Sequence, residues 1–342
     1  KGVLIVKAWQ LENFGLDNLK QVELEKPEIT EDQILIKVNS VSLNYRDTAI
    51  VEGIYTPELL KFPFIPVSDA SGIVVEIGSK VTKFKKGDRV TSHMFTKWLD
   101  GKPKSDEQSH ALGATVDGGL SEYMVLNANA AVFSPETLTD NQSSTLPVAA
   151  FVNWFSLVEY GNIKAGDKVL VQGTGGVSIF AIQIASALGA EVIATSSSDE
   201  KLEKAKELGA SKVINYKTHP DWEKEVQKLT NGKGVEHIVE VVGGSSIAKS
   251  IDALAFQGHI YVIGFLENME ANVNLFALLA KQARIQGINL GHHRAFEDFN
   301  KALDQINIDP VIDTVYSFDQ AKEAYEHQME GAFGKIVIDF NK

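Results

Sequence analysis

The chain contains no cysteine among its 342 residues. Without thiols it can form neither disulfide bonds nor thiolate metal sites, so cysteine usage leaves the compartment open. It also lacks any apolar run approaching the roughly 20 residues that a membrane-spanning helix needs. The apolar segment Val3–Val6 is too short for the core of a signal peptide and predicts an opening strand. We therefore expect no membrane partner, and the cytoplasm is the expected compartment.

The chain also has fewer positively charged than negatively charged residues. The chain has 33 Lys and Arg residues against 45 Asp and Glu residues, a net charge of −12 at pH 7. This balance argues against nucleic acid or an anionic membrane surface as a partner. The content of 44% hydrophobic and 23% charged residues is ordinary for a globular protein, and 342 residues suffice for two domains.

The most informative segment follows the pattern strand, glycine-rich turn, helix, strand. The β-rich Val169–Val171 precedes the turn, and apolar residues then recur at helical spacing until Gly189. In such a unit the glycines let the backbone approach a pyrophosphate, and the N–H groups that open the helix face its charge. Ser178 replaces the third glycine of the usual pattern and is small enough for close helix–strand packing. The predicted dinucleotide-binding loop comprises Gly173, Thr174, Gly175, Gly176 and Val177.

A carboxylate is missing at the end of the second predicted strand, Glu191–Thr195. Proteins that bind NAD usually carry Asp or Glu there, about 20 residues after the glycines, to hold the ribose 2′-hydroxyl. Here Ser196, Ser197 and Ser198 can donate hydrogen bonds to a 2′-phosphate, and Lys201 can supply charge. The pattern therefore favours NADPH. In the alternative interpretation Ser198 caps the next helix and Lys201 is solvated, and both can hold at once.

The rest of the chain divides into a β-rich first part and an alternating second part. Short strands are predicted at 33–38 and 72–78. After the loop, strands are predicted at Lys212–Asn215, His237–Val242, His259–Ile263 and Arg284–Asn289. With the two strands around the loop these make six parallel strands of a doubly wound sheet. The tail, 296–340, has the pattern helix, strand, helix, strand and is expected to fold back onto the first domain.

The order and spacing of these motifs resemble the medium-chain dehydrogenase/reductase superfamily over essentially the full length. The resemblance rests on Gly72, Gly78, Gly87–Val90, Gly119–Tyr123 and Gly173–Val177. It implies an α/β fold in which a Rossmann NADP-binding domain, 126–291, joins a chaperonin-10-like β-rich catalytic domain formed by 1–125 and 292–342, with the active site between them. It also implies cofactor contacts at Asn44, Val152, Tyr216, Val242, Gly243, Ile263, Gly264, Phe265, Leu290 and Gly291.

Zinc-dependent members of that family carry an early Cys, a Gly-His-Glu and a later Cys. The corresponding places here are Asn44, Ser68–Asp69 and Ala149–Ala150, which do not supply the usual tetrahedral ligands. A weaker site could in principle use Asp47, Asp69 and His93, but a structural role is the expected one for these residues. The resemblance is therefore to the zinc-independent, quinone-oxidoreductase-like branch, in which Asn commonly replaces the first ligand, and no bound metal is expected.

Without a metal, conjugated carbonyls are suitable substrates. Hydride attacks their β-carbon while negative charge develops on the enolate oxygen, which needs a hydrogen-bond donor. The resemblance makes Asn44 and Tyr45 the expected catalytic residues. Asn44 could donate to the oxygen or orient the cofactor carboxamide, and Tyr45 could donate a proton directly or through water, with Tyr55 as a second phenol. Alternatively, Asn44 holds a turn and Tyr45 serves packing.

The sequence thus predicts an NADPH-dependent oxidoreductase acting on a small quinone, enone or related carbonyl compound. The alternatives are an alcohol dehydrogenase or carbonyl reductase of the same fold and a non-enzymatic NADPH-binding relative. A methyltransferase would want an acidic residue where Ser196 stands. Family relatives also join two Rossmann sheets at an edge, so we expect a homodimer formed through 259–263 or the following 273–279.

Overall fold

The computed structural model describes residues 2–342, which divide into two compact units. The first unit extends to Phe151 and also contains Gly291–Gln305 and Asp309–Lys342, and the second comprises Val152–Leu290 and Ile306–Ile308. The tail therefore returns to the first unit almost entirely, as the sequence predicted. The boundary after residue 125 is different, because 126–151 belong to the first unit. The reason is that strand β7 (Ala131–Phe133) pairs with β5 (Arg89–Ser92).

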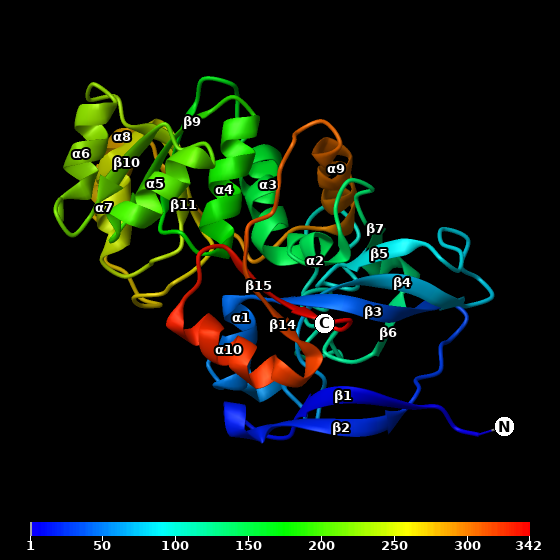
Figure 1. Cartoon of the computed structure of the whole chain (residues 1–342). Coiled ribbons are helices and arrows are strands. Elements are labelled where there is room, and N and C mark those ends of the chain that lie inside the picture. Colours follow the sequence, from blue (N-terminus) through cyan, green and yellow to red (C-terminus); the bar gives the residue numbers. More distant parts are fainter. Residues whose placement is uncertain (1) are drawn as a thin grey trace. The chain divides into compact units, whose positions relative to one another are not determined.

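The second unit is built on a sheet of six parallel strands, as predicted (Figure 1). The strands are β8 (Lys168–Gln172), β9 (Glu191–Ser196), β10 (Lys212–Asn215), β11 (Val235–Glu240), β12 (Leu254–Val262) and β13 (Arg284–Gly287), in the order β10-β9-β8-β11-β12-β13. The chain moves outward from β8 in one direction and then from β11 in the other. In sheets of this kind ligands bind beyond the carboxyl ends of the strands where the order reverses, here β8 and β11.

Helices connect these strands. They are α4 (Gly176–Ala187), α5 (Asp199–Glu207), α6 (Trp222–Leu229), α7 (Ser246–Ala253) and α8 (Leu275–Lys281). All residues of α4 from Ser178 to Ala185 are buried, which explains why this helix is apolar on every side. The core beneath the helices includes Leu170, Ile193, Ile238 and Ile260, all buried side chains of the central strands.

The predicted dimer edge needs correction. Residues 259–263 were expected at the sheet edge, but β12 pairs with β11 on one side and β13 on the other. The edge strand on this side of the sheet is β13, which the sequence analysis predicted as a strand without assigning it to the edge. The second candidate, 273–279, forms the start of helix α8 rather than an edge strand.

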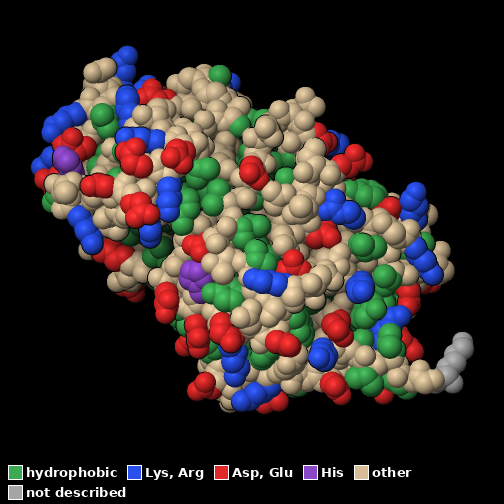
Figure 2. Space-filling view, in the orientation of Figure 1, with side chains coloured by type: hydrophobic (Ala, Val, Ile, Leu, Met, Phe, Trp, Pro, Cys, Tyr) green, Lys and Arg blue, Asp and Glu red, His purple; other side chains and the backbone are tan. Residues whose placement is uncertain are grey.

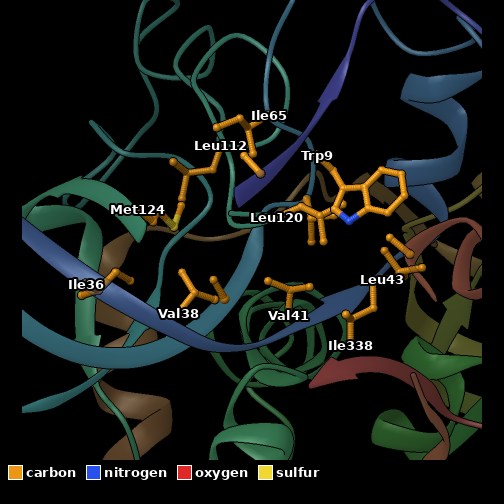
Figure 3. Close-up of a cluster of buried hydrophobic side chains, with 14 of the residues drawn as sticks. Trp9, Ile36, Val38, Val41, Leu43, Ile65, Leu112, Leu120, Met124 and Ile338 are labelled. Atoms are coloured by element: carbon orange, nitrogen blue, oxygen red, sulfur yellow. The ribbon is translucent and has the colours of Figure 1, made fainter. Parts of the chain in front are cut away.

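The first unit contains a two-stranded antiparallel ribbon and a larger sheet. The ribbon is β1 (Ile5–Leu11) with β2 (Leu19–Glu25). The seven-stranded sheet has the order β14-β15-β3-β4-β5-β7, with β6 also paired to β3, and its further strands are β3 (Gln33–Leu43), β4 (Asp69–Ile77), β6 (Tyr123–Asn127), β14 (Ile312–Ser317) and β15 (Lys335–Asp339). Figure 3 shows Trp9, Val41 and Ile338 converging in the core of this unit, where all three are buried.

The helices of the first unit complete its fold. They are α1 (Tyr45–Val51), α2 (Asp140–Ser143), α9 (His293–Leu303) and α10 (Ala321–Glu330). The short helix α3 (Phe151–Trp154) crosses from the first unit to the second. Short 3-10 or π turns occupy Leu16–Asn18, Pro57–Leu59, Ala128–Ala130, Leu146–Ala150, Phe155–Tyr160 and Phe318–Gln320. The tail has the predicted order helix, strand, helix, strand. Its last strand, β15, pairs antiparallel with β3, so that Ile336 lies opposite Leu43.

The surface agrees with the mixed composition. On the face shown in Figure 2, acidic and basic side chains are interspersed rather than gathered into a broad patch of one sign. Across residues 2–342, none of the helices has both the length and the apolar character needed to cross a membrane.

Candidate functional site

The glycine-rich loop lies at the carboxyl end of β8. Gly173 has φ 75°, a conformation that side chains other than glycine rarely adopt, and its N–H donates to Thr195 O at 2.8 Å, which ties the loop to β9. A Cβ atom added at Gly173 or Gly175 would meet no heavy atom within 4 Å. The protein's own packing therefore does not require glycine at Gly175, whereas close approach of a ligand to the backbone would.

The N-terminus of α4 is suited to an anion. Gly175 is its N-cap, and no side chain in the described chain caps this helix. Ser178 instead turns inward, is buried, and donates its Oγ to Gln172 O at 2.6 Å. The first N–H groups of a twelve-residue helix thus lack a side-chain acceptor, and the helix dipole makes that end favourable for negative charge. These residues fit the pyrophosphate of a dinucleotide.

The predicted ribose residues lie together at the ends of β9 and β10. Asn215 pairs with Ser196 across the strands, and the N–H of the exposed Tyr216 donates to Ser196 O at 3.1 Å. Ser198 caps α5 by accepting from the Lys201 N–H at 3.3 Å, as the alternative interpretation proposed. The Lys201 side chain is exposed, so it remains available for a 2′-phosphate.

A buried carboxylate that the sequence analysis missed organises the neighbouring loop. Glu240 is fully buried at the end of β11, and its Oε1 accepts from the N–H groups of Val242 and Gly243 at 3.2 and 3.0 Å. Its Oε2 accepts from Gln172 Nε2 at 2.9 Å, which joins the ends of β8 and β11. The available signal was an acidic residue inside an otherwise apolar strand. Glu240 therefore fixes the backbone that is predicted to approach the cofactor.

Other predicted cofactor contacts occupy buried or tightly packed positions. A Cβ at Gly264 would lie 2.9 Å from Val241 O, so internal packing already requires glycine there. Val152 and Leu290 are buried at the two ends of the second unit's main segment. Gly291 belongs to the first unit, where its carbonyl oxygen accepts from His93 Nε2 at 2.9 Å. The half-buried Ile263 and Phe265 flank Gly264, and contact of all these residues with a cofactor stays a prediction.

The first unit contains a buried polar cluster around Asn44, which is the N-cap of α1. The Asn44 backbone N–H donates to Asp47 Oδ2 at 2.8 Å, so this residue does hold the turn between β3 and α1. Its side chain is also engaged, because Lys335 Nζ donates to Asn44 Oδ1 at 2.6 Å and to Leu43 O at 2.5 Å. Asn44 Nδ2 is buried and makes no hydrogen bond of ordinary geometry among residues 2–342, although it lies close enough to the Asp69 carboxyl to lower its pKa. The cluster thus contains an amide donor that no hydrogen bond of ordinary geometry occupies, with the Asp69 carboxyl beside it.

Two buried carboxyl groups surround this amide. Ser68 Oγ donates to Asp69 Oδ1 at 2.7 Å, while Asp69 Oδ2 has no hydrogen-bond partner of ordinary geometry in the described chain. Burial raises the pKa of Asp69 to about 6, although Lys335 and the nearby Asn44 amide lower it. Burial also raises the pKa of Asp47. Burial lowers the pKa of Lys335 to about 8 against the opposing effect of both carboxyls.

The rings of the two predicted phenols, Tyr45 at the start of α1 and Tyr55 after the end of this helix, contact each other. The ring centroids of Tyr45 and Tyr55 are 6.3 Å apart and nearly perpendicular. Tyr45 is 39% exposed, so it is not a core residue, and burial raises the pKa of the half-buried Tyr55. The structure therefore brings the second candidate proton donor next to the first.

The residues considered for a weak metal site do not assemble. Asp47 and Asp69 belong to the cluster with Lys335, whereas His93 contacts Phe151 and Phe296. Burial lowers the pKa of His93 to about 3, which keeps its imidazole neutral. Within residues 2–342 no group of three or more His, Cys, Asp or Glu side chains is arranged to hold a metal ion.

Comparison with known proteins identifies the family. Residues 30–136 match the alcohol dehydrogenase GroES-like domain, and residues 176–307 match the zinc-binding dehydrogenase family. A zinc-type alcohol dehydrogenase-like protein of Schizosaccharomyces pombe is 43% identical over 95% of this chain and 96% of its own. Human quinone oxidoreductase is 28% identical over 98% of both chains.

Solved structures agree with this assignment. A protein from Sinorhizobium meliloti that is named only provisionally as an alcohol dehydrogenase superposes with a TM-score of 0.92 at 43% identity, covering 99% of this chain and 100% of its own. A thermostable alcohol dehydrogenase from Pyrobaculum aerophilum has a TM-score of 0.84 at 27% identity, covering 98% and 100%. The chain therefore belongs to the medium-chain dehydrogenase/reductase superfamily, as an oxidoreductase whose fold binds a nicotinamide dinucleotide.

Proposed function

We propose that the protein uses NADPH to reduce a quinone, an enone or a related carbonyl compound without a catalytic metal ion. The observation that carries the proposal is the buried Asn44 amide, whose Oδ1 is held by Lys335 while Nδ2, beside Asp69, makes no hydrogen bond of ordinary geometry in the described chain. A preorganised donor of this kind is what a substrate oxygen needs when negative charge develops on it. The relatives named quinone oxidoreductase support the same substrate class.

The nicotinamide supplies the hydride when the cofactor is bound. In reduction of an enone, the hydride and its electron pair go to the β-carbon, the carbon–carbon π bond breaks, and charge moves to the carbonyl oxygen. Asn44 Nδ2 donates a hydrogen bond to that oxygen. A proton from Tyr45, directly or through water, adds to the α-carbon, so the saturated carbonyl and NADP⁺ are the products. Tyr45 can exchange its proton with solvent because it is 39% exposed.

NADPH rather than NADH is the proposed cofactor. The end of β9 carries Ser196 and Ser197 with no carboxylate to repel a 2′-phosphate, and the exposed Lys201 lies one helical turn beyond them. Tyr216 is exposed beside this strand end and can pack against the adenine or the phosphate.

A homodimer is the proposed assembly. The edge strand β13 leaves one side of its backbone without a neighbouring strand in the described chain. Large apolar side chains on or near this part of the unit are exposed, namely Phe256, Leu275, Phe276, Leu279 and Ile285. A second copy related by a two-fold axis would extend the sheet through β13 and cover these side chains.

The catalytic proposal is tested by steady-state turnover and metal analysis. The wild-type protein should oxidise NADPH with 2-cyclohexenone or p-benzoquinone, contain no stoichiometric zinc by elemental analysis, and keep its activity in EDTA. Asn44→Ala should lower turnover about 10²- to 10³-fold because a preorganised donor is lost. Tyr45→Phe should also lower turnover. In both variants NADPH affinity should remain near wild type.

Asn39→Ala provides a matched control. Asn39 lies on β3, the strand that leads to Asn44, and its Nδ2 donates to Asp140 Oδ2 at 2.7 Å. This variant therefore loses a structural hydrogen bond and should turn over normally per folded molecule. Normal turnover by both Asn44→Ala and Tyr45→Phe would contradict their catalytic assignment.

A second candidate function is the oxidation of alcohols or the reduction of simple carbonyls, which the alcohol dehydrogenase names of several relatives favour. Turnover of a saturated alcohol with NADP⁺ that exceeds turnover of any enone with NADPH would select it. NADPH binding without turnover of either class would instead indicate a non-enzymatic relative.

A further inference from the structure

Lys335 is a buried cation inside the first unit. Its side chain is 3% exposed, and it lies on β15, the last strand of the chain, which pairs with β3. Its Nζ donates to Leu43 O at 2.5 Å and to Asn44 Oδ1 at 2.6 Å. Burial of a charge costs several kcal/mol unless it is well paired, so a lysine here calls for a specific explanation.

The ammonium group determines which way the Asn44 amide faces. An ammonium has hydrogen-bond donors but no acceptor, so it can contact the amide only through its oxygen. The Nδ2 group must then point away from Lys335. It makes no hydrogen bond of ordinary geometry within the described chain, and it lies close enough to Asp69 to lower the pKa of that carboxyl. If the Asn44 amide flipped, its Nδ2 group would face the Lys335 ammonium, so that two donors met. Oδ1 would then lie where Nδ2 lies now. Lys335 thus presets Asn44 as a donor.

A charged donor on Oδ1 also strengthens the N–H groups of the same amide. Hydrogen bonds in a chain polarise one another, and the effect is larger in a buried site where the effective dielectric constant is low. We propose that Lys335 is a positioning residue that orients and polarises the Asn44 amide for hydrogen bonding to the substrate oxygen. This inference rests on the proposed catalytic role of Asn44.

A purely structural role for Lys335 would need only one of its two hydrogen bonds. A single bond to Leu43 O would anchor β15 to the end of β3, where Ile336 already pairs with Leu43 in the strand register. The second bond, to Asn44 Oδ1, adds nothing to this strand pairing. It connects the last strand of the chain to the turn at the start of α1, where the predicted catalytic residues lie.

The charges around Lys335 give the proposal a pH dependence. Asp69 of β4 and Asp47 of α1 act on its ammonium, and Arg46 of α1 and Tyr325 of α10 act on Asp47 in turn. Because burial lowers the pKa of Lys335 to about 8, the ammonium is charged at neutral pH and loses its proton under mildly alkaline conditions. The neutral amine polarises Asn44 less and no longer enforces its orientation. Turnover should therefore be high below pH 8 and fall as the pH rises through it.

The variant test uses enone turnover by the full-length protein at pH 7. Lys335→Met, which keeps an unbranched side chain one atom shorter and removes its charge, should lower kcat about tenfold to a hundredfold while NADPH affinity stays near wild type. Lys335→Arg stays charged at every pH tested and should restore much of kcat and remove the fall above pH 8. Lys83→Met is the matched control, since Lys83 is a half-buried lysine of the same unit that contacts a different carbonyl, Ala131 O.

A double variant separates this inference from the proposed function. If Lys335 acts through Asn44, adding Lys335→Met to Asn44→Ala should produce no further loss of kcat. The inference would be overturned if the kcat losses of the two single variants multiplied in the double variant. It would also be overturned if Lys335→Met folded and had normal kcat while Asn44→Ala was slow. Either result would leave the proposed function standing. Normal kcat for Asn44→Ala would instead overturn the role of Asn44 itself, and the role of Lys335 with it.

A measurement that needs neither turnover nor cofactor completes the test. The Nδ2 side-chain NMR signals of Asn44 are assigned by their absence from Asn44→Ala. In wild type their chemical shifts should change with pH, and the midpoint of this change should equal the midpoint of the pH profile of kcat. In Lys335→Met this shift should vanish. If Lys335→Met fails to fold, the wild-type kcat profile and NMR titration decide alone: a coincident midpoint near 8 supports the inference, and a flat NMR titration up to pH 10 contradicts it.

Discussion

At the residue scale, Asn44 holds the turn that one interpretation of the sequence assigned to it, and its side chain keeps the geometry that the proposed catalytic role needs. Its backbone N–H begins α1 by donating to Asp47, and its side chain is held by Lys335. Because the backbone bond does not depend on the side chain, Asn44→Ala keeps this half of the capping box at the start of α1. It leaves Lys335 with one acceptor fewer, so a stability loss of about 1–3 kcal/mol should accompany the loss of turnover. Activity must accordingly be normalised to folded protein.

The buried Asp69 gives a pH-dependent stability prediction at the same scale. Its folded pKa of about 6 lies above its ordinary value of 3.8, so the folded state binds more protons in that window. Asp69 therefore lowers stability progressively as the pH rises from about 4 to 6, and the full cost is present above pH 6. Asp69→Asn keeps an acceptor for Ser68 and removes this titration.

We expect the free energy of unfolding of Asp69→Asn, relative to wild type, to rise by on the order of 2–3 kcal/mol between pH 4 and pH 6.5, since each pKa unit corresponds to about 1.4 kcal/mol. Urea unfolding at a series of pH values measures this difference. A difference that stays constant over the range would mean that Asp69 titrates normally in the folded protein.

At the element scale, the junction of β9 and α5 is expected to select the nucleotide. Ser198 is occupied in capping α5, and Ser196 is buried, so the exposed Lys201 is the residue whose replacement tests the 2′-phosphate with least disturbance to the fold. The same turn accommodates both interpretations, because the capping Ser198 and the proposed phosphate contact Lys201 lie three residues apart at the start of α5.

Lys201→Ala should weaken NADPH binding about ten- to a hundredfold and leave NADH binding nearly unchanged, because one charge-assisted contact to the phosphate is lost. Isothermal titration calorimetry with both nucleotides measures the ratio. Lys206→Ala serves as the control on the same helix, since Lys206 pairs with Glu203 on the surface. Equal wild-type affinity for NADH and NADPH would refute the serine-cluster argument.

At the scale of the whole molecule, the exposed apolar side chains near β13 are the feature that a monomer leaves unexplained. Phe276 is 76% exposed and Leu279 is 70% exposed, both on the short helix α8 that packs against β12. Exposed clusters of large apolar side chains usually mark interaction surfaces.

Light scattering at micromolar concentration should give the mass of two chains. Phe276→Glu with Leu279→Glu should shift the protein toward a monomer, because burying two carboxylates in the interface is unfavourable. Leu59→Glu, at an exposed leucine of the first unit, should leave the mass unchanged. A monomeric wild type would contradict the proposed assembly.

Much of the fold could be predicted because its signals are local. The six parallel strands, the glycine turn and the tail's alternation of helix and strand all follow from spacing within about 10 residues, where backbone preference and side-chain periodicity act. Position within the sheet is different. The edge was assigned to 259–263 although β13 lies outside it, because strand order depends on packing between distant segments.

The sequence alone thus determined where most strands and helices and the nucleotide loop lie, and the family resemblance made Asn44 a candidate catalytic residue. Only the tertiary structure revealed that Lys335, 291 residues away, holds the Asn44 amide, and that Glu240 fixes the backbone of Val242 and Gly243. The physical reason is that a buried charge takes its partners from whichever segments the fold brings together. Its sequence neighbours, such as the apolar Ile336 and Val337 after Lys335, do not predict that pairing.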